Sequence, residues 1–391
     1  MSKGVNIGYL VHDLGDPAVA RRVAMFRKGG ASVDLYGFHR GDAVPSAVEG
    51  VTPRDLGQTK DGKLALRALS VLYRRASVGS WAQGLKNADV IVARQLETLV
   101  LACAAKKRLG LSAPIVYELL DVHGVMVKDH PASALLRRYE GALLNQCAAV
   151  MLSSPAFERE YLAKHHPRRP ASILVENKVF SAQAAPLPPS FSEPASPGPA
   201  SSVPAPGPPW KLGWFGVIRC KRSLACLAAL ARSHPDLVEI HIHGRIANTD
   251  MGDVDALLKG IPNLRYHGPY RYPDDLPRIY GGVHFVWAID FYEAGFNSAW
   301  LLPNRLYEGG LHGVVPIALD GTETARWLDD HGVGLKLPSA IEDHAAGLFS
   351  SMTPAAYRTA SRNLRTLNPE TFYWADAACE RLTRQLGNLS S

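Results

Sequence analysis

The chain has 391 residues, of which 47% are hydrophobic, 20% charged and 8% aromatic. This composition is typical of a folded globular protein and excludes collagenous, coiled-coil and wholly disordered chains. The length is too great for one compact core and suits two domains. There is no apolar run of about 18 residues to span a membrane and no signal-peptide pattern. The five cysteines are scattered without a C-x-x-C pair, so we expect a reduced cytoplasm rather than disulfides or zinc.

Positive charge is concentrated in the first half of the chain. The formal net charge is +7, but residues 1–181 hold 25 basic and 16 acidic side chains, an excess of nine. The remaining residues therefore carry a net charge of −2. Such asymmetry favours attraction to an anionic membrane, a phosphate-bearing substrate or nucleic acid. Composition alone does not choose among the three.

Apolar runs without alternation predict strands that are covered on both faces. In the first half they lie at residues 5–11, 32–38, 89–94, 115–120, 149–153 and 172–176. A proline-, alanine- and serine-rich segment, residues 182–209, then predicts an extended linker. In the second half the runs lie at residues 211–217, 238–243, 283–289 and 314–319, with weaker ones at 264–267 and 333–337. Helical patterns lie between the strands at residues 17–29, 95–109, 133–147, 223–233 and 303–311, and a last helix is expected at 371–387.

Alternating strands and helices predict parallel sheets with right-handed crossovers. We therefore predict an α/β protein with two Rossmann-like, doubly wound domains facing a cleft, at residues 1–181 and 210–370. The C-terminal helix, within residues 371–391, is expected to pack back toward the first domain. Ligands of open α/β sheets bind at the carboxyl ends of the strands, so the functional residues are expected in the loops that follow them.

Polar side chains follow the first predicted strand. The loop His12–Pro17 reads HDLGDP, where a dinucleotide-binding fold would have G-x-G-x-x-G. His12 and Asp13 are candidates for acceptor contact or catalysis. Asp16 directly before Pro17 also fits a helix N-cap, so capping and acceptor contact both stay open for it.

The fourth predicted strand runs into Asp121 and His123. A carboxylate and an imidazole two residues apart at a strand end are a plausible acid/base pair. The alternative is a helix N-cap or a loop hydrogen bond. Asp121 is the first candidate for a general base, with His123 and Asp13 as further catalytic candidates.

The second half opens with a basic turn. Arg219, Lys221 and Arg222 follow a strand and a glycine and precede a helix. Backbone N–H groups and a helix dipole attract anions, and cations neutralise phosphate, so the turn predicts a diphosphate site. A solvated turn is the alternative.

A second motif follows the strand at 283–289. Asn304, Arg305 and Glu308 lie in the first turns of a helix that begins after Pro303. A cation for phosphate and a carboxylate for a ribose diol would both be available near the positive end of this helix. The alternative is a local salt bridge between Arg305 and Glu308.

With these motifs the chain resembles the GT-B nucleotide-sugar glycosyltransferases, and more narrowly the bacterial exopolysaccharide enzymes of the succinoglycan and xanthan kind. The basic turn and the P-N-R-L-Y-E helix before G-V-V-P-I-A carry the resemblance. It implies that the second domain binds the nucleotide sugar and the first binds the acceptor. It also implies contacts of the basic turn with diphosphate and of Glu308 with ribose.

The resemblance extends to three further stretches. V-Y-E-L-L-D-V is similar to the segment that holds the catalytic aspartate in xanthan-type glucuronosyltransferases, which supports Asp121. The segment 173–180 resembles the family's hinge, which implies that Glu176, Asn177 and Lys178 line the cleft. Base or phosphate contacts often occur where this chain has His243, Gly244 and Arg245, although a paired strand-end histidine fits as well. The first glutamate of the family's E-x7-E pattern is replaced by Trp300, which argues against a retaining mechanism.

Residues 63–81 alternate leucines with lysine and arginine and end in Trp81. A basic amphipathic helix of this kind can lie on anionic lipid, with tryptophan at the headgroups. The alternative is a surface helix packed on its own domain. Nucleic acid is not expected as a partner, because no known recognition module is present.

Together these features predict a glycosyltransferase that moves a hexose or hexuronic acid from a UDP-sugar to a polyprenyl-pyrophosphate-linked oligosaccharide in exopolysaccharide biosynthesis. We expect it at the cytoplasmic face of the plasma membrane. A base at Asp121 and the missing glutamate favour inversion and a β-linkage. No D-x-D motif stands at a strand end, so no metal and no cofactor other than the donor is expected. The alternatives are a nucleotide-sugar epimerase of the same fold and a non-catalytic sugar-nucleotide-binding protein.

Overall fold

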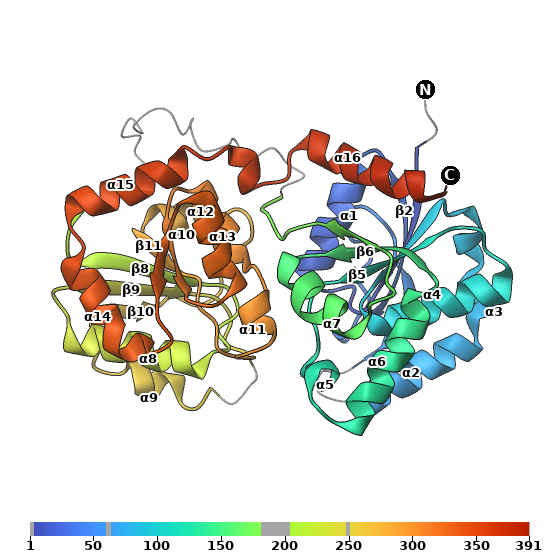
Figure 1. The fold of residues 1–391 in the computed structure, drawn as a ribbon, viewed down its shortest axis with the longest axis horizontal. Helices are drawn as coiled ribbons and strands as arrows, with labels where there is room; N and C mark the ends of the chain where they lie inside the picture. The colour runs from blue at the N-terminus through green and yellow to red at the C-terminus, as the bar shows by residue number, and fades with distance from the viewer. Residues whose placement is uncertain (1–3, 60–63, 181–203, 248–250, 391) are drawn as a thin grey trace. The chain divides into compact units, whose positions relative to one another are not determined.

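The computed structural model describes residues 4–59, 64–180, 204–247 and 251–390 (Figure 1). The chain divides into two compact units. The first unit comprises Met1–Glu176, Phe180–Gln183 and Trp374–Ser391, and the second comprises Asn177–Val179 and Ala184–Tyr373. The C-terminal segment is therefore part of the first unit. Of the expected linker, residues 182–203 lie outside the described residues.

The first unit is built on a seven-stranded sheet in the order β3-β2-β1-β4-β5-β6-β7, and each neighbouring pair is parallel. The strands are β1 (Asn6–Val11), β2 (Ser32–His39), β3 (Arg54–Gln58), β4 (Val90–Arg94), β5 (Ile115–Leu119), β6 (Cys147–Leu152) and β7 (Ala171–Leu174). Six of them were predicted from their apolar runs. The edge strand β3 was missed because its sequence, RDLGQ, has only one buried residue.

Helices cover both faces of this sheet. They are α1 (Pro17–Lys28), α2 (Leu64–Ala76), α3 (Val78–Trp81), α4 (Leu96–Leu109), α5 (Gly124–Val127), α6 (Pro131–Leu144), α7 (Ala163–His165) and α16 (Asp376–Gly387), with a π-helical turn at Phe157–Leu162. On one face α1 packs with α16, whose Cys379, Leu382 and Leu386 join a core with β1, β4, β5 and β6 (Figure 1). On the other face α4 contacts β1, β4 and β5 and is itself covered by α2 and α6.

The second unit has a six-stranded sheet in the order β10-β9-β8-β11-β12-β13, again with parallel pairs. Its strands are β8 (Trp210–Phe215), β9 (Val238–His243), β10 (Leu264–Tyr266), β11 (Phe285–Trp287), β12 (Val315–Leu319) and β13 (Leu335–Leu337). Its helices are α8 (Lys221–Ser233), α9 (Val254–Leu258), α10 (Leu276–Gly281), α11 (Asn297–Trp300), α12 (Asn304–Leu311), α13 (Glu323–His331), α14 (Ile341–Ser351) and α15 (Pro354–Arg365).

Each sheet contains one switch point, where the strand order reverses. In the first unit it lies between β1 and β4, and in the second between β8 and β11. Crossover helices leave opposite faces of the sheet there, so the loops at the carboxyl ends diverge and leave room for a ligand. The polar loops predicted as functional follow these same strands.

One amphipathic helix was expected over residues 63–81. Residue 63 lies outside the described residues, and the rest of the segment forms two helices, α2 and α3. Leu66, Leu69, Leu72 and Tyr73 of α2 are exposed, so an apolar face does meet solvent. Trp81 is buried at 7% exposure, and its indole Nε1 donates to the Arg74 carbonyl at 2.9 Å. The expected headgroup position of Trp81 is therefore wrong, because the end of the segment turns into the core. No helix among the described residues is long and apolar enough to cross a bilayer.

Candidate active site

In the second unit a cation–carboxylate pair spans the switch point. Arg219 follows β8, and its guanidinium Nη2 and Nε lie 3.0 and 3.3 Å from Asp290 Oδ2, which follows β11. The Tyr292 ring lies under the same guanidinium, 5.0 Å from its centroid. Asp290 and Tyr292 thus hold Arg219 at the carboxyl edge of the sheet. Arg219 was predicted from the sequence, but neither Asp290 nor Tyr292 was.

The loops that follow β8 and β9 are joined to one another. Ile218 N donates to the Arg245 carbonyl at 2.9 Å, and Gly216 N donates to the His243 carbonyl at 3.0 Å. Gly244 has φ +149°, and a Cβ on it would stand 1.6 Å from the Gly216 carbonyl oxygen. Only glycine fits such an approach, so Gly244 serves to bring the two backbones together.

The three cations of the basic turn have different surroundings. Arg222 donates to both carboxylate oxygens of Glu342 at 2.9 and 3.0 Å and to the Ser339 carbonyl, with its guanidinium over the Phe291 ring. It is thus turned toward α14. Lys221 is exposed at the first residue of α8, and its ammonium group makes no hydrogen bond or ion pair within the described ranges. Lys221 and Arg219 are therefore better placed than Arg222 to meet an anion at this helix N-terminus.

Helix α12 brings Arg305 to the same edge. Its Nη1 donates to the Phe215 carbonyl at 3.2 Å, at the end of β8. Its Nε is buried without a hydrogen-bond partner among the described residues, the kind of group that a ligand can satisfy. Asn304, the first residue of α12, is exposed.

Glu308, one turn after Arg305, is 3% exposed and accepts a hydrogen bond from the Tyr280 hydroxyl at 2.7 Å. Burial raises the pKa of Tyr280 well above its usual value, and the Glu308 charge raises it further. Tyr280 is therefore a hydroxyl donor at neutral pH. The hydrogen bonds given for these two side chains lead to different partners, the Phe215 carbonyl for Arg305 and the Tyr280 hydroxyl for Glu308.

His243, at the end of β9, is a buried neutral imidazole. Its ring stacks on His267 at 4.2 Å between centroids. Burial, together with the nearby His267 and Arg278, lowers the pKa of His243 to about 4. Arg245 is exposed and contributes its carbonyl to the loop pairing.

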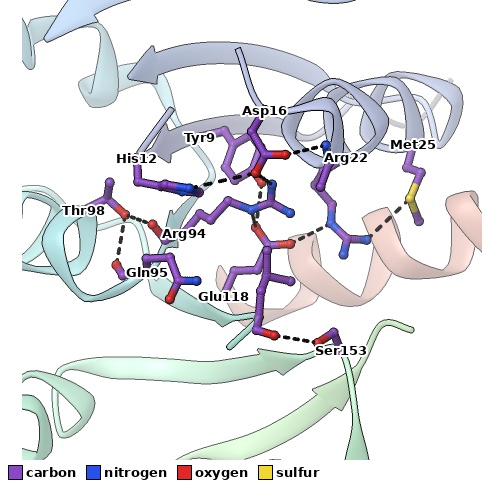
Figure 2. Close-up of polar contacts among 12 residues, drawn as sticks. Tyr9, His12, Asp16, Arg22, Met25, Arg94, Gln95, Thr98, Glu118 and Ser153 are labelled. Carbon is purple, nitrogen blue, oxygen red and sulfur yellow. Dashed lines mark hydrogen bonds and ion pairs between the residues drawn. The ribbon is translucent and has the colours of Figure 1, made fainter. Parts of the chain in front are cut away.

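In the first unit another cation–carboxylate pair spans the switch point, as Figure 2 shows. Asp16 caps α1 after β1, and its Oδ2 lies 3.6 Å from Arg94 Nη1 at the end of β4. His12 Nε2 lies 3.9 Å from the same oxygen. Burial lowers the pKa of His12, and the nearby Arg94 charge lowers it further, whereas Asp16 opposes the shift. His12 is therefore neutral at pH 7.

A buried carboxylate, Glu118, holds Arg94 of this pair in place. Glu118 of β5 is 1% exposed and accepts hydrogen bonds from Arg22 Nε at 2.7 Å, Arg94 Nε at 3.0 Å and the Tyr9 hydroxyl at 2.6 Å (Figure 2). Burial alone would raise the pKa of Glu118, but the two guanidiniums and the Tyr9 hydrogen bond lower it to about 2. Glu118 is thus ionised and fixes both arginines.

Asp121 is contacted by Gln95, the residue that follows Arg94 in the chain. The Gln95 amide donates to the Asp121 carboxylate, and Gln95 has φ +73°, a strained conformation for a residue with a side chain. Strained residues of this kind are frequent at functional sites. In this conformation the Gln95 amide points toward Asp121. His123 is exposed at the N-cap position of α5.

The remaining predicted residues lie at two other places. Asp13 is a buried residue of the loop His12–Pro17, where its carboxylate accepts a hydrogen bond from Gly15 N at 3.0 Å and lies 3.4 Å from Arg40 Nε. Glu176 is the last residue of the first unit before the crossing, and its carbonyl accepts from Trp374 Nε1 at 2.9 Å. Asn177 and Lys178 belong to the second unit, where Lys178 Nζ donates to the Glu370 carbonyl at 3.0 Å.

Arg94, Gln95 and Glu118 were missed by the sequence analysis. Arg94 ends the run VIVAR, and Glu118 interrupts the run IVYEL. A charge within a strand buried on both faces must be paired, and this signal could have pointed to both residues. Asp290 gave no comparable signal, because acidic residues are common in exposed loops.

Comparison with known proteins supplies the family. The chain is 42% identical over 386 residues to the succinoglycan biosynthesis protein ExoL of Rhizobium meliloti (strain 1021), covering 99% of this chain and 94% of that protein. No protein-family model matches. The chain belongs to the GT-B exopolysaccharide glycosyltransferases.

Solved structures support the same fold at low identity. HepE from Anabaena, solved with UDP and glucose, superposes with a TM-score of 0.65 at 16% identity, covering 97% of this chain and 98% of that one. Sucrose-phosphate synthase from Thermosynechococcus elongatus superposes with a TM-score of 0.67 at 14% identity, covering 98% of each chain. The predicted GT-B architecture and glycosyltransferase class are therefore confirmed.

Proposed function

We propose that this glycosyltransferase moves a hexose or hexuronic acid from a UDP-sugar to a polyprenyl-pyrophosphate-linked oligosaccharide in the assembly of a succinoglycan-like polysaccharide. The proposal of a nucleotide-sugar donor rests on one observation. Two cations and a helix N-terminus lie together at the end of β8, namely Arg219, Arg305 and the start of α8. Fixed cations and helix N–H groups at one strand end suit a diphosphate. UDP and UDP-glucose complexes of HepE support a UDP-sugar as the donor class.

The proposed chemistry is an inverting displacement. Asp121, aimed by Gln95, accepts the proton of an acceptor hydroxyl while that oxygen attacks the anomeric carbon. The bond to the UDP oxygen breaks, and the electron pair leaves with UDP. Arg219 and Lys221 neutralise the charge that develops on the departing diphosphate. No metal is required in this scheme, because the protein's own cations take that role.

A UDP-sugar binding measurement tests the donor half. UDP-, GDP- and ADP-sugars are compared by thermal shift, since a ligand that binds the folded state raises its apparent stability. We expect Arg219→Ala to weaken UDP-sugar binding by about 10- to 100-fold, because it removes a charge-assisted contact. Arg222→Ala is the matched control, because Arg222 is paired with Glu342 of α14, whereas Arg219 is paired with Asp290 at the switch point. Absence of a shift with every nucleotide sugar would contradict the donor proposal.

Release of UDP on transfer distinguishes the reaction classes. With acceptor present, the wild-type protein is expected to release UDP, and Asp121→Asn is expected to bind donor but not transfer. Conversion of a free UDP-sugar to its epimer without acceptor would favour an epimerase instead. Equal transfer by wild type and Asp121→Asn would remove Asp121 from the role of base.

The acceptor half includes contact with an anionic membrane at the cytoplasmic face. In α2, Leu69 is 60% and Leu72 53% exposed, and both lie on the helix that carries the exposed Arg75. In α6, Leu135 is 69% exposed, and Arg138, three residues later in the same helix, is also exposed. Exposed leucines flanked by arginines suit an interface of acyl chains and anionic headgroups.

Sedimentation with vesicles tests this contact. We expect binding to vesicles of anionic phosphatidylglycerol and not to those of phosphatidylcholine, and weaker binding at high salt. Leu69→Ser with Leu72→Ser should reduce binding to the anionic vesicles. Leu174→Ser, which changes an exposed leucine in β7, is the control and should leave it unchanged. If the double variant of α2 binds the anionic vesicles as strongly as Leu174→Ser does, then α2 is not the element that contacts the membrane.

A further inference from the structure

The amino end of α1 is already occupied by a carboxylate of the chain itself. Asp16 Oδ1 accepts a hydrogen bond from Ala18 N at 2.9 Å, and the Asp16 carbonyl accepts from Val19 N at 2.9 Å. The N-terminus of a 12-residue helix attracts anions through its N–H groups and dipole. In this unit the anion is Asp16.

Arg94 stands behind Asp16 and is 1% exposed. Glu118 holds its Nε, while its Nη1 makes no hydrogen bond among the described residues and lies 3.6 Å from Asp16 Oδ2. Arg22 and Arg94 share the single charge of Glu118, so the buried cluster retains one positive charge. Asp16 compensates that charge, as a buried cation requires.

The two carboxylates of the loop are thus each balanced by an arginine, Arg40 or Arg94, and the loop is rich in hydrogen-bond acceptors. The second carboxylate of the loop, Asp13, lies 3.4 Å from Arg40. The Asp16 side chain is 28% exposed and the His12 side chain 14% exposed. Carboxylate oxygens and a neutral imidazole are suited to hydroxyl groups, whereas a phosphate would meet two carboxylates and would have to displace Asp16 from the helix.

We propose that Asp16 takes the anion position of this switch point, so that the loop His12–Asp16 receives an uncharged, hydroxyl-bearing sugar of the acceptor and not its phosphate. Arg94 is the positioning residue that holds Asp16 there. The assignment rests on the proposed function, in which the first unit takes the acceptor, and it deepens that function by naming which part of the acceptor this loop meets. The positive charge of the first unit then acts elsewhere than at this loop.

Removing the Asp16 charge while keeping the cap tests the proposal. Asn and Ser are both good N-cap residues, so Asp16→Asn and Asp16→Ser leave α1 capped but leave Arg94 uncompensated. The probe is inorganic phosphate, titrated into the full-length protein at pH 7.5. The readout is the NMR signal of the His12 ring, which is assigned by its loss in His12→Asn.

We expect the His12 signal of the wild type to be insensitive to phosphate. Both Asp16 variants should show a saturable shift, with apparent affinity tighter by at least about tenfold. Asp13→Asn is the matched control, because it removes a carboxylate of the same loop that faces the partly exposed Arg40, and it should stay insensitive. Adding Arg94→Met to Asp16→Asn should abolish the gained response.

Phosphate binding of equal strength in the wild type and in Asp16→Asn would overturn the proposal. No gain in either Asp16 variant would overturn it as well, provided that thermal unfolding shows both to be folded; two different caps guard against a folding defect in one. Failure of the donor proposal is separate, because it is measured by UDP-sugar binding to the second unit. These variants should bind UDP-sugar like the wild type.

Discussion

The buried Glu118 is expected to be the most costly single charge to remove from the first unit. Glu118→Gln keeps the shape and polar character of the side chain but leaves Arg22 and Arg94 without their shared counter-charge. Removing one partner of a buried ion pair costs about 3–5 kcal/mol. Because all three side chains are at most 4% exposed, solvent cannot replace the lost carboxylate.

The same ion pairs make the stability of the first unit depend on pH. The folded pKa of Glu118 is lowered to about 2, and a glutamate in an unfolded chain has a pKa of about 4.3. The difference corresponds to about 3 kcal/mol of stability. Because the folded pKa is the lower one, this stability is complete above the unfolded pKa. It is lost as the pH falls toward 2, so less than half should remain at about pH 3.

Urea unfolding of wild type and Glu118→Gln at pH 7 and at lower pH measures the difference. Hydrogen exchange of peptides from β4 and β5 assigns the transition to the first unit, since two units need not unfold together. Glu160→Gln is the control, because Glu160 also pairs with two cations, Arg159 and Lys164, but at the surface. It should cost less than about 1 kcal/mol. An equal cost for both variants, or a Glu118 effect that does not change with pH, would refute the reasoning.

Three further predictions concern the second unit and whether the transfer reaction requires a metal ion. Gly244→Ala should abolish UDP-sugar binding and lower the thermal midpoint, because its Cβ would overlap the Gly216 carbonyl oxygen; an unchanged thermal shift would contradict this. His243 should stay neutral from pH 8 to pH 5, since its pKa is about 4; an NMR titration of its ring with a midpoint above pH 6 would be inconsistent with the buried stack. Because the folded pKa is depressed, the contribution of His243 to stability should fall as the pH drops from about 6.5 toward 4; the measurement is the slope of stability against pH, which should be shallower in His243→Gln. Transfer activity should survive EDTA; a loss that Mg²⁺ restores would show that a metal is required.

The loops after β1, β5, β8 and the helix α12 were predicted from the sequence because polar residues there follow apolar runs directly. The exact partners were not. Arg219, Lys221 and Arg222 look equivalent in the sequence, yet Arg222 is held by Glu342, which is 120 residues away. Arg219 is held by Asp290, 71 residues away. Nothing in the local pattern of the basic turn distinguishes these three cations.

The sequence by itself determined the architecture, the family and the strand ends that carry polar residues. The architecture and the strand ends follow from short-range patterns, because a parallel strand covered on both faces must be apolar along its length. The family was indicated by the resemblance of the basic turn and the P-N-R-L-Y-E helix. The tertiary structure decided which charges meet. Arg94 and Asp16 lie on strands and loops that are far apart in the chain and adjacent only at the switch point of the sheet. At the loop His12–Asp16 the buried charge of Arg94 is compensated by Asp16, so the positive excess of the first half lies elsewhere in that unit. This distribution depends on burial and distance, and no count of charges contains it.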